Sequence, residues 1–204
     1  MIAIIDYDAG NIKSVEKALQ FLGEEAIITS NRDVILSSDK AILPGVGAFG
    51  DAMNKIRERG LEDVIHEFVD SGKPFLGICL GLQLFFEESE ESPGVKGLGL
   101  LKGTITKIPN DINGISQKVP QIGWNNIKVN PESKLLAGLG DNQYVYFVHS
   151  YYLTAADSSD VAATTEYGVK IDAAVERGNV MATQFHPEKS SDVGLKILRN
   201  FINL

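Results

Sequence analysis

Residues 1–80 alternate short apolar runs, rich in β-branched side chains, with longer stretches whose apolar residues recur at helical spacing. The spacing predicts strands at 2–5, 26–29, 40–43 and 74–78, and helices around 12–22, 34–36, 49–59 and 61–71. This alternation is typical of βα units wound around a parallel sheet. We therefore predict an α/β fold with a mainly parallel central sheet and helices on both faces.

The sequence pattern changes from about residue 98 onward to alternating runs rich in β-branched residues, which are joined by Gly, Asn and Asp turns. The expected strands are 103–108, 127–129, 144–153, 161–167, 172–176 and 180–185, and we expect them to be antiparallel. Two helices have clear start signals: Asn11 is expected to cap the first, which Gly23 ends, and Ser190-Ser191 the last. No linker or repeat divides the chain, so residues 1–204 are expected to form a single domain.

Composition excludes several kinds of protein. The chain is 44% hydrophobic and 23% charged, and its single cysteine cannot form an internal disulfide or a cysteine-rich zinc site. The formal net charge of −8, with no basic stripe, makes a nucleic-acid partner unexpected. The N-terminal run lacks a basic leader, and no apolar stretch approaches the roughly 18 to 20 residues that a bilayer demands. We expect a cytosolic protein that does not enter membranes.

Cys79 lies between a predicted strand and an apolar-periodic helix, with Gly77 and Gly81 two residues to either side. This Gly-x-Cys-x-Gly pattern predicts a nucleophile elbow, a turn so sharp that larger flanking side chains would clash. The elbow would leave Cys79 among free amides at a helix N-terminus, where a thiolate is stabilised and the Leu80 amide can face an oxyanion. The alternative is a buried cysteine that packs as a small hydrophobe.

A nucleophilic cysteine needs a base, and the chain offers only His66, His149 and His186. His66 fits a helix surface, and His149 fits a structural or pocket-lining position. His186 is the best candidate because it ends an apolar strand and precedes Pro187, which favours extended geometry. Continued alternation would place Glu188 on the same side, where a carboxylate could orient the imidazole. A strand-ending turn with a surface carboxylate is the alternative.

The glycine-rich loop Pro-Gly-Val-Gly at 44–47 follows a strand at the same edge of the sheet as the elbow. Its glycines allow a backbone amide to turn toward a developing oxyanion. A P-loop is excluded because no Gly-Lys-Ser/Thr follows. The Gly-x-Gly-x-x-Gly match of Gly45, Gly47 and Gly50 follows the third strand rather than the first, which argues against a dinucleotide site.

These motifs together resemble the class I (triad) glutamine amidotransferases, and among them the glutaminase subunits of imidazole glycerol phosphate synthases. The resemblance covers nearly the whole chain and rests on seven blocks. They are Ile-Asp-Tyr-Asp-Ala-Gly-Asn at 5–11, Pro-Gly-Val-Gly-Ala-Phe-Gly at 44–50, Gly-Ile-Cys-Leu-Gly-Leu-Gln at 77–83 with its acidic tail, Pro-Gln-Ile-Gly-Trp-Asn at 120–125, Phe-Val-His-Ser-Tyr-Tyr at 147–152, Thr-Glu-Tyr-Gly at 165–168 and Gln-Phe-His-Pro-Glu-Lys-Ser-Ser at 184–191. The resemblance implies a flavodoxin-like fold.

The resemblance also implies a glutaminase in which Cys79 attacks the side-chain amide of glutamine, His186 carries the proton and Glu188 orients the imidazole. The Val46 and Leu80 amides would form the oxyanion hole. The implied substrate contacts are Gly45, Gly47, Gln83, Glu91, His149, Ser150 and Tyr151. Three of them also fit ordinary positions, Gln83 as a polar helix residue, Glu91 as a solvated charge and Tyr151 as a strand aromatic.

The family delivers its ammonia to a (βα)8-barrel cyclase subunit, so the implied partner is such a subunit in a heterodimer. The cyclase makes imidazole glycerol phosphate and an aminoimidazole carboxamide ribonucleotide in histidine biosynthesis. Asn11, Trp124, Tyr146 and Lys189 match partner-facing positions, although both aromatics could equally belong to the core. No cofactor or metal is implied.

Two positions depart from the family pattern: Asp8 stands where a glycine is expected, and Gln121-Ile122 replaces His-Met. A paralogue that serves another acceptor, such as an aminated sugar or a vitamin ring, therefore stays open as an alternative. A noncatalytic flavodoxin-like binding module, with Cys79 merely packed, is the alternative from another class.

Overall fold

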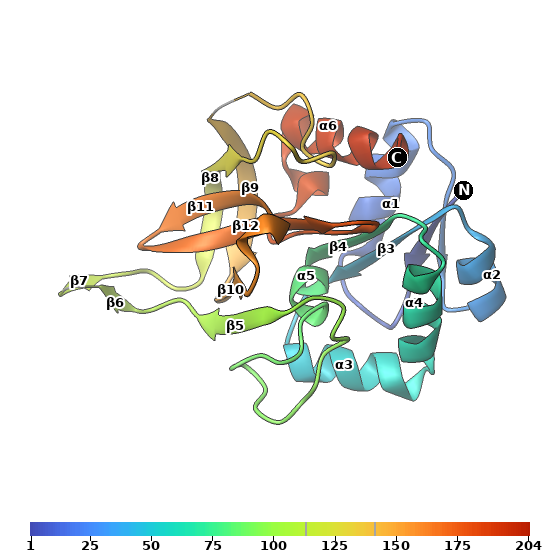
Figure 1. Cartoon of the computed structure of the whole chain (residues 1–204), viewed down its shortest axis with the longest axis horizontal. Helices are drawn as coiled ribbons and strands as arrows, with labels where there is room; N and C mark the ends of the chain where they lie inside the picture. Colours follow the sequence, from blue (N-terminus) through green and yellow to red (C-terminus); the bar gives the residue numbers. More distant parts are fainter. Residues whose placement is uncertain (113, 141) are drawn as a thin grey trace.

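The structure is a computed structural model that describes residues 1–112, 114–140 and 142–204. Its largest sheet has nine strands in the order β2-β1-β3-β4-β13-β12-β11-β8-β9 (Figure 1). The strands of this sheet are β1 (Ile2–Ile5), β2 (Ala26–Thr29), β3 (Lys40–Gly45), β4 (Phe75–Cys79), β8 (Gln121–Val129), β9 (Gln143–His149), β11 (Val161–Tyr167), β12 (Val169–Arg177) and β13 (Val180–Thr183). Two small antiparallel pairs stand apart, β5 (Gly103–Lys107) with β10 (Tyr151–Ala155), and β6 (Asp111–Ile112) with β7 (Ile115–Ser116).

Helices cover both faces of the large sheet. They are α1 (Ile12–Phe21), α2 (Arg32–Ser37), α3 (Phe49–Glu58), α4 (Leu61–Asp70), α5 (Leu80–Leu84) and α6 (Ser191–Ile202), with 3-10 turns η1 (Ser158–Asp160) and η2 (Pro187–Lys189). Helices α1 and α6 lie on one face, and α3 and α4 lie on the other (Figure 1). The predicted α/β architecture is confirmed, with β1 to β4 parallel to their neighbours and β8, β11 and β12 antiparallel.

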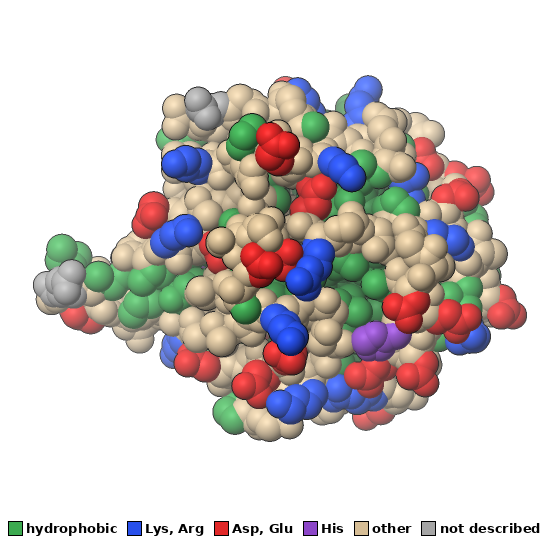
Figure 2. Space-filling view, in the orientation of Figure 1, with side chains coloured by type: hydrophobic (Ala, Val, Ile, Leu, Met, Phe, Trp, Pro, Cys, Tyr) green, Lys and Arg blue, Asp and Glu red, His purple; other side chains and the backbone are tan. Residues whose placement is uncertain are grey.

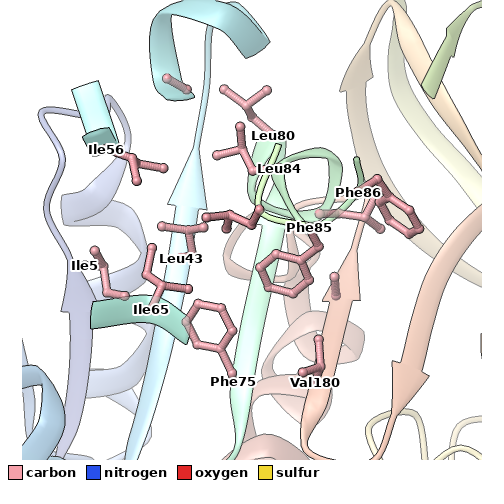
Figure 3. Packing of buried hydrophobic residues seen from close by; sticks show 14 of the residues in the cluster. Ile5, Leu43, Ile56, Ile65, Phe75, Leu80, Leu84, Phe85, Phe86 and Val180 are labelled. Carbon is pink, nitrogen blue, oxygen red and sulfur yellow. The ribbon is translucent and has the colours of Figure 1, made fainter. Parts of the chain in front are cut away.

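Side-chain alternation along the buried strands builds two cores. In β1, Ile2 and Ile4 join the core under α1 and α6, whereas Ala3 and Ile5 join the core under α3 and α4. Figure 3 shows the second of these cores, where the Phe75 and Phe85 rings stack with centroids 5.1 Å apart. Because β4 is packed on both faces, its last residue is held rigidly, and that residue is Cys79.

Two expectations for the second half are wrong. The predicted strand 144–153 breaks at Ser150 into β9 and β10, which belong to different sheets. The run 180–185 is parallel to β4 rather than antiparallel, although it pairs antiparallel with β12. All four residues of β13 are buried, which is typical of a central strand with parallel pairing.

Neither predicted cap is made by the expected side chain. Asn11 and Ser190 occupy the N-cap positions of α1 and α6, but no side-chain capping hydrogen bond forms at either. The Ser190 hydroxyl instead donates to the His186 carbonyl at 2.6 Å and accepts from the Tyr146 amide at 3.0 Å. Asn11 likewise hydrogen-bonds to a distant residue, Glu188, so both side chains connect separate segments of the chain instead of capping their helices.

The β6–β7 hairpin projects from the body of the molecule (Figure 1). On the face in Figure 2, acidic and basic side chains are intermixed over the surface. Within the described part of the chain, none of the helices combines the length and the apolar character needed to cross a bilayer.

Candidate functional site

Cys79 forms the predicted elbow between β4 and α5. Its backbone has φ 56° and ψ −107°, a strained conformation for a residue with a side chain. A Cβ on Gly81 would collide with the Leu43 carbonyl, and one on Gly77 would lie 2.8 Å from the Gly81 carbonyl oxygen. The flanking glycines are therefore required by close backbone approach, as predicted. Because α5 spans only five residues, the helix dipole behind the sulfur is that of a short helix.

His186 is brought beside this elbow by the turn that follows β13. Its amide donates to the Tyr146 carbonyl at 3.0 Å, which ties the turn to β9. His186 itself is extended, as expected before Pro187, with φ −97° and ψ 96°. Glu188, however, lies in the 3-10 turn η2 rather than in a continued strand. The two side chains meet because the turn folds back, not because strand alternation persists.

The His186 and Glu188 side chains form a buried pair. His186 Nδ1 lies 2.8 Å from Glu188 Oε1, and the two side chains are 1% and 0% exposed. Asn11 donates from Nδ2 to the same Glu188 oxygen at 2.7 Å. His186 Nε2 and Glu188 Oε2 are buried and have no hydrogen-bond partner among the described residues. The imidazole is thus held by one nitrogen, and the other is free for proton transfer.

Opposing effects act on the protonation of His186. Burial alone would lower the pKa of the imidazole, but the nearby Cys79 and the hydrogen-bonded Glu188 outweigh burial and raise that pKa from 6.5 to about 9. An imidazolium at neutral pH beside Cys79 is the protonation state that accompanies a thiolate. This combination is typical of a cysteine nucleophile with its base.

A cavity of about 260 Å³ opens onto Cys79. Its walls contain eight of the residues expected at the oxyanion hole and the substrate site. They are Val46, Gly47, Leu80, Gln83, Glu91, His149, Ser150 and Tyr151. Sequence reasoning missed Pro120 and Val148, which also line it. Gly45 does not line the cavity but pairs in register with Cys79 across β3 and β4.

Gln83 is buried in the cavity wall, and its side-chain NH2 group already makes two hydrogen bonds. Its Nε2 donates to the Tyr151 carbonyl and to Gln184 Oε1, each at 3.1 Å. A side-chain amide has two N–H groups, so only Oε1 is left to meet a ligand, and it can only accept. Gln83 is therefore not an ordinary polar helix residue.

Glu91 is also not a free solvated charge. Its Oε2 accepts from the Phe49 amide at 2.8 Å, and the Ser92 hydroxyl accepts from the Gly50 amide at 2.9 Å. These two side chains supply the caps that Ala48, at the N-cap position of α3, cannot provide. Glu91 thereby fixes the end of the glycine-rich loop while it lines the cavity.

His149 is held by both ring nitrogens. Nδ1 lies 2.9 Å from the Tyr151 carbonyl and Nε2 lies 2.8 Å from Gln121 Oε1. Burial lowers the pKa of His149 to about 4, so the ring is neutral at pH 7 and has a single N–H. The Tyr151 carbonyl takes that N–H, so the Gln121 amide must turn its NH2 toward Nε2. Gln121 and His149 face each other in the β8–β9 register.

Tyr7 is a buried residue near the site that sequence reasoning did not single out. Its hydroxyl donates to the Pro44 carbonyl at 3.0 Å and lies so close to Gly45 that a Cβ there would collide with it. Burial and the nearby Cys79 raise the pKa of Tyr7, so the phenol stays protonated as a donor. It holds the start of the glycine-rich loop beside the elbow.

The residues expected at a partner interface lie near the triad. Trp124 is 53% exposed, and its ring meets Tyr146 edge-on with centroids 6.1 Å apart. Lys189 is exposed, and Asn11 and Tyr146 are half-buried. The exposed Ile122 and Tyr144 belong to the same face of β8 and β9, a signal available from strand alternation. Neither aromatic of the expected pair is a core residue.

Asp8, the departure from the family pattern, adopts φ 72°. This is the left-handed region that glycine favours and aspartate tolerates better than most residues. The Asp8 carboxylate pairs with Lys55 Nζ at 3.0 Å, and the hydrogen bond from Lys55 lowers the pKa of Asp8. The turn at Asp8 thus keeps the backbone conformation that a glycine would adopt.

Across the described residues, no three His, Cys, Asp or Glu side chains gather where they could hold a metal ion.

Comparisons with known proteins agree with this geometry. The family model described as glutamine amidotransferase class-I matches residues 3–204, and the chain belongs to that family. The chain is 51% identical over 201 residues to the imidazole glycerol phosphate synthase subunit HisH of Bacillus cereus (strain G9842), covering 98% of this chain and 93% of that protein. It is 48% identical over 204 residues to the subunit of the same name from Methanocaldococcus jannaschii, covering 100% of both chains.

Solved structures show the same fold. A glutamine amidotransferase crystal structure superposes with a TM-score of 0.78 at 21% identity, covering 100% of this chain and 98% of that one. The structure of PurLQS from Thermotoga maritima gives a TM-score of 0.75 at 20% identity, covering 99% and 97%. The predicted class I glutamine amidotransferase fold is confirmed.

Proposed function

We propose that this chain is the glutaminase subunit of an imidazole glycerol phosphate synthase, which hydrolyses glutamine to glutamate and ammonia. The observation that carries the proposal is Cys79 on a cavity of about 260 Å³, with the buried His186 and Glu188 pair close enough for Cys79 to act on the His186 imidazole. Identity near 50% over the whole chain to HisH subunits supports the choice of synthase. Both hydrophobic cores pack against the same sheet, which also supports a single domain over residues 1–204.

The proposed reaction follows from the roles that the geometry allows. Cys79 Sγ, as a thiolate, attacks the side-chain carbonyl carbon of glutamine, and His186 Nε2 carries the proton. Collapse of the tetrahedral intermediate transfers that proton to the leaving nitrogen, which departs as ammonia and leaves a glutamyl thioester. His186 then takes a proton from water, which attacks the thioester and releases glutamate. Glu188 holds the imidazole through Nδ1 throughout.

The Val46 and Leu80 amides are the proposed donors to the oxyanion, since both residues line the cavity beside Cys79. Gln83 Oε1 and the Glu91 carboxylate are acceptors, so they suit the ammonium group of glutamine. His149, Ser150 and Tyr151 form the facing wall. Gly47, at φ 101°, permits the loop to turn, and Gly45 sets its start beside Cys79.

The proposed partner is a (βα)8-barrel cyclase subunit that receives the ammonia for histidine biosynthesis. The docking face is the exposed surface of β8 and β9, with Trp124 and Tyr146, together with Lys189 and Asn11. Exposed aromatic residues are the usual anchors of protein interfaces. The face is adjacent to the triad, because the Tyr146 carbonyl accepts the His186 amide.

Glutamate release measured on the isolated chain, and again with the cyclase subunit and its ligand, tests the proposal. We expect the partner to raise the rate and Cys79→Ser to abolish it. Activity unaffected by Cys79→Ser would remove the triad from the reaction. An active glutaminase that forms no complex with the cyclase would instead indicate a triad amidotransferase serving another acceptor. Absence of any glutaminase activity would favour a binding module.

A further inference from the structure

Gln184 is a fully buried polar residue that contacts the sulfur of Cys79. It follows β13 directly, is 0% exposed, and donates its backbone amide to the Ala173 carbonyl at 2.8 Å. Its side-chain Nε2 lies 3.8 Å from Cys79 Sγ as a donor, within the range of hydrogen bonds to sulfur. The side chain therefore ends at the reacting atom.

The orientation of the Gln184 amide is fixed from the opposite end. Gln83 Nε2 donates to Gln184 Oε1 at 3.1 Å, and a carbonyl oxygen in that contact leaves the NH2 group for the sulfur. Gln83 is fixed in turn, because its other N–H goes to the Tyr151 carbonyl. A continuous row of hydrogen bonds thus runs from the cavity wall through two buried glutamines to the sulfur.

We propose that Gln184 is a catalytic residue whose side-chain amide stabilises the Cys79 thiolate, with Gln83 as the positioning residue that orients it. The inference rests on the proposed function. It extends the triad by a donor from the residue that follows β13, which reaches the sulfur independently of His186.

The physical reason lies in the two protonation states of the sulfur. As a thiol, Cys79 donates toward the Val148 carbonyl at 3.8 Å and gains little from a further donor. As a thiolate, it has no proton to give and accepts from the Gln184 amide. A hydrogen bond to an anion is roughly twice as strong as one to a neutral acceptor, so the amide favours the thiolate.

The row of hydrogen bonds from Gln83 through Gln184 also connects the substrate cavity to the Cys79 sulfur. Gln83 lines the cavity, and its free Oε1 is the atom that a bound ammonium group would reach. A ligand that holds Gln83 would hold the Gln184 amide against the sulfur. The sulfur is then most strongly stabilised when the cavity is filled.

Gln184→Met tests the proposal, since methionine has a similar length and no N–H donor. The first readout is the pH at which alkylation of Cys79 by iodoacetamide reaches half its maximal rate, and the second is glutamine hydrolysis with the cyclase subunit present. We expect the alkylation midpoint to move to higher pH and kcat to fall about tenfold or more, because the thiolate loses one charge-assisted hydrogen bond, with KM within about twofold. Gln20→Met, on the exposed side of α1, is the control and should match the wild type.

Gln83→Met gives an independent check that leaves Gln184 in place. It should move the alkylation midpoint in the same direction by a smaller amount, and it should raise KM as well, because Gln83 lines the cavity. A midpoint for Gln184→Met equal to that of the wild type would overturn the inference. Loss of glutaminase activity in Cys79→Ser would then leave the proposed function standing, so the two failures are distinguishable.

Discussion

Asn11 and Glu188 are 177 residues apart in the chain, and the Asn11 side-chain amide donates to Glu188 Oε1 at 2.7 Å. The same oxygen lies 2.8 Å from His186 Nδ1. The carboxylate is therefore held between the loop that precedes α1 and the turn η2. Asn11, expected as a helix cap and at the partner-facing surface, connects the loop before α1 to the proposed catalytic base.

Asn11→Gly should lower kcat for glutamine hydrolysis by about tenfold or more and leave KM unchanged, since loss of a hydrogen bond to a charged group costs about 1.5 to 3 kcal/mol. Glycine is chosen because Asn11 has φ 67°, which glycine adopts without strain. Steady-state kinetics with the cyclase subunit present measures the effect. A variant with wild-type kcat would show that Glu188 does not depend on Asn11.

His186 should titrate near pH 9 in the wild type and at lower pH in Cys79→Ser, because the sulfur is one of the two groups that raise its pKa. A raised native pKa stabilises the fold fully below the unfolded value of about 6.5, and that stabilisation is lost as pH rises through about 9. Imidazole NMR shifts, assigned with His→Asn variants, give the midpoints. Equal midpoints in the two proteins would contradict a coupled pair.

His149 should make the protein less stable in mild acid. Its folded pKa of about 4 lies below 6.5, so the unfolded chain binds the proton first, and stability falls as pH drops from about 6.5 to about 4. His149→Asn keeps a donor for the Tyr151 carbonyl but cannot titrate. The free energy of unfolding at pH 7 and pH 5 should differ less in this variant than in the wild type. The His66→Asn control should keep the wild-type difference.

Tyr7→Phe should destabilise the fold by about 1 kcal/mol, the usual net value of a buried hydrogen bond, because the Pro44 carbonyl loses its donor. The glycine-rich loop would also lose its fixed start, so kcat should fall. Tyr167→Phe is the matched control, since the Tyr167 hydroxyl donates to the Lys118 carbonyl at 2.8 Å in an exposed setting. If both variants gave the same kcat, Tyr7 would have no role in the loop.

Local features of the fold and site were predictable from the sequence. The elbow at Cys79 is set by Gly77 and Gly81 within two residues, and strand β1 and helix α4 are set by apolar periodicity. The sequence predicts the His186 and Glu188 pair through continued strand alternation, although a 3-10 turn rather than a strand brings the two side chains together.

Contacts between distant segments were not predictable. The cap that Glu91 gives to Phe49 and the row from Gln83 to Gln184 depend on how separate loops pack. The break at Ser150 is likewise tertiary, because β10 leaves the main sheet to pair with β5. A polar side chain in a strand or loop carries no local signal of which distant group it will meet.

We propose that Cys79 is a nucleophile activated by His186. Intact-mass measurement after treatment with a glutamine-mimicking electrophile tests it most directly. We expect one adduct per chain in the wild type, none in Cys79→Ser, and much slower labelling in His186→Ala, because loss of a triad base costs several kcal/mol of barrier. An unlabelled wild-type protein, or a Cys79→Ser variant labelled at the wild-type rate, would show that Cys79 is not the nucleophile.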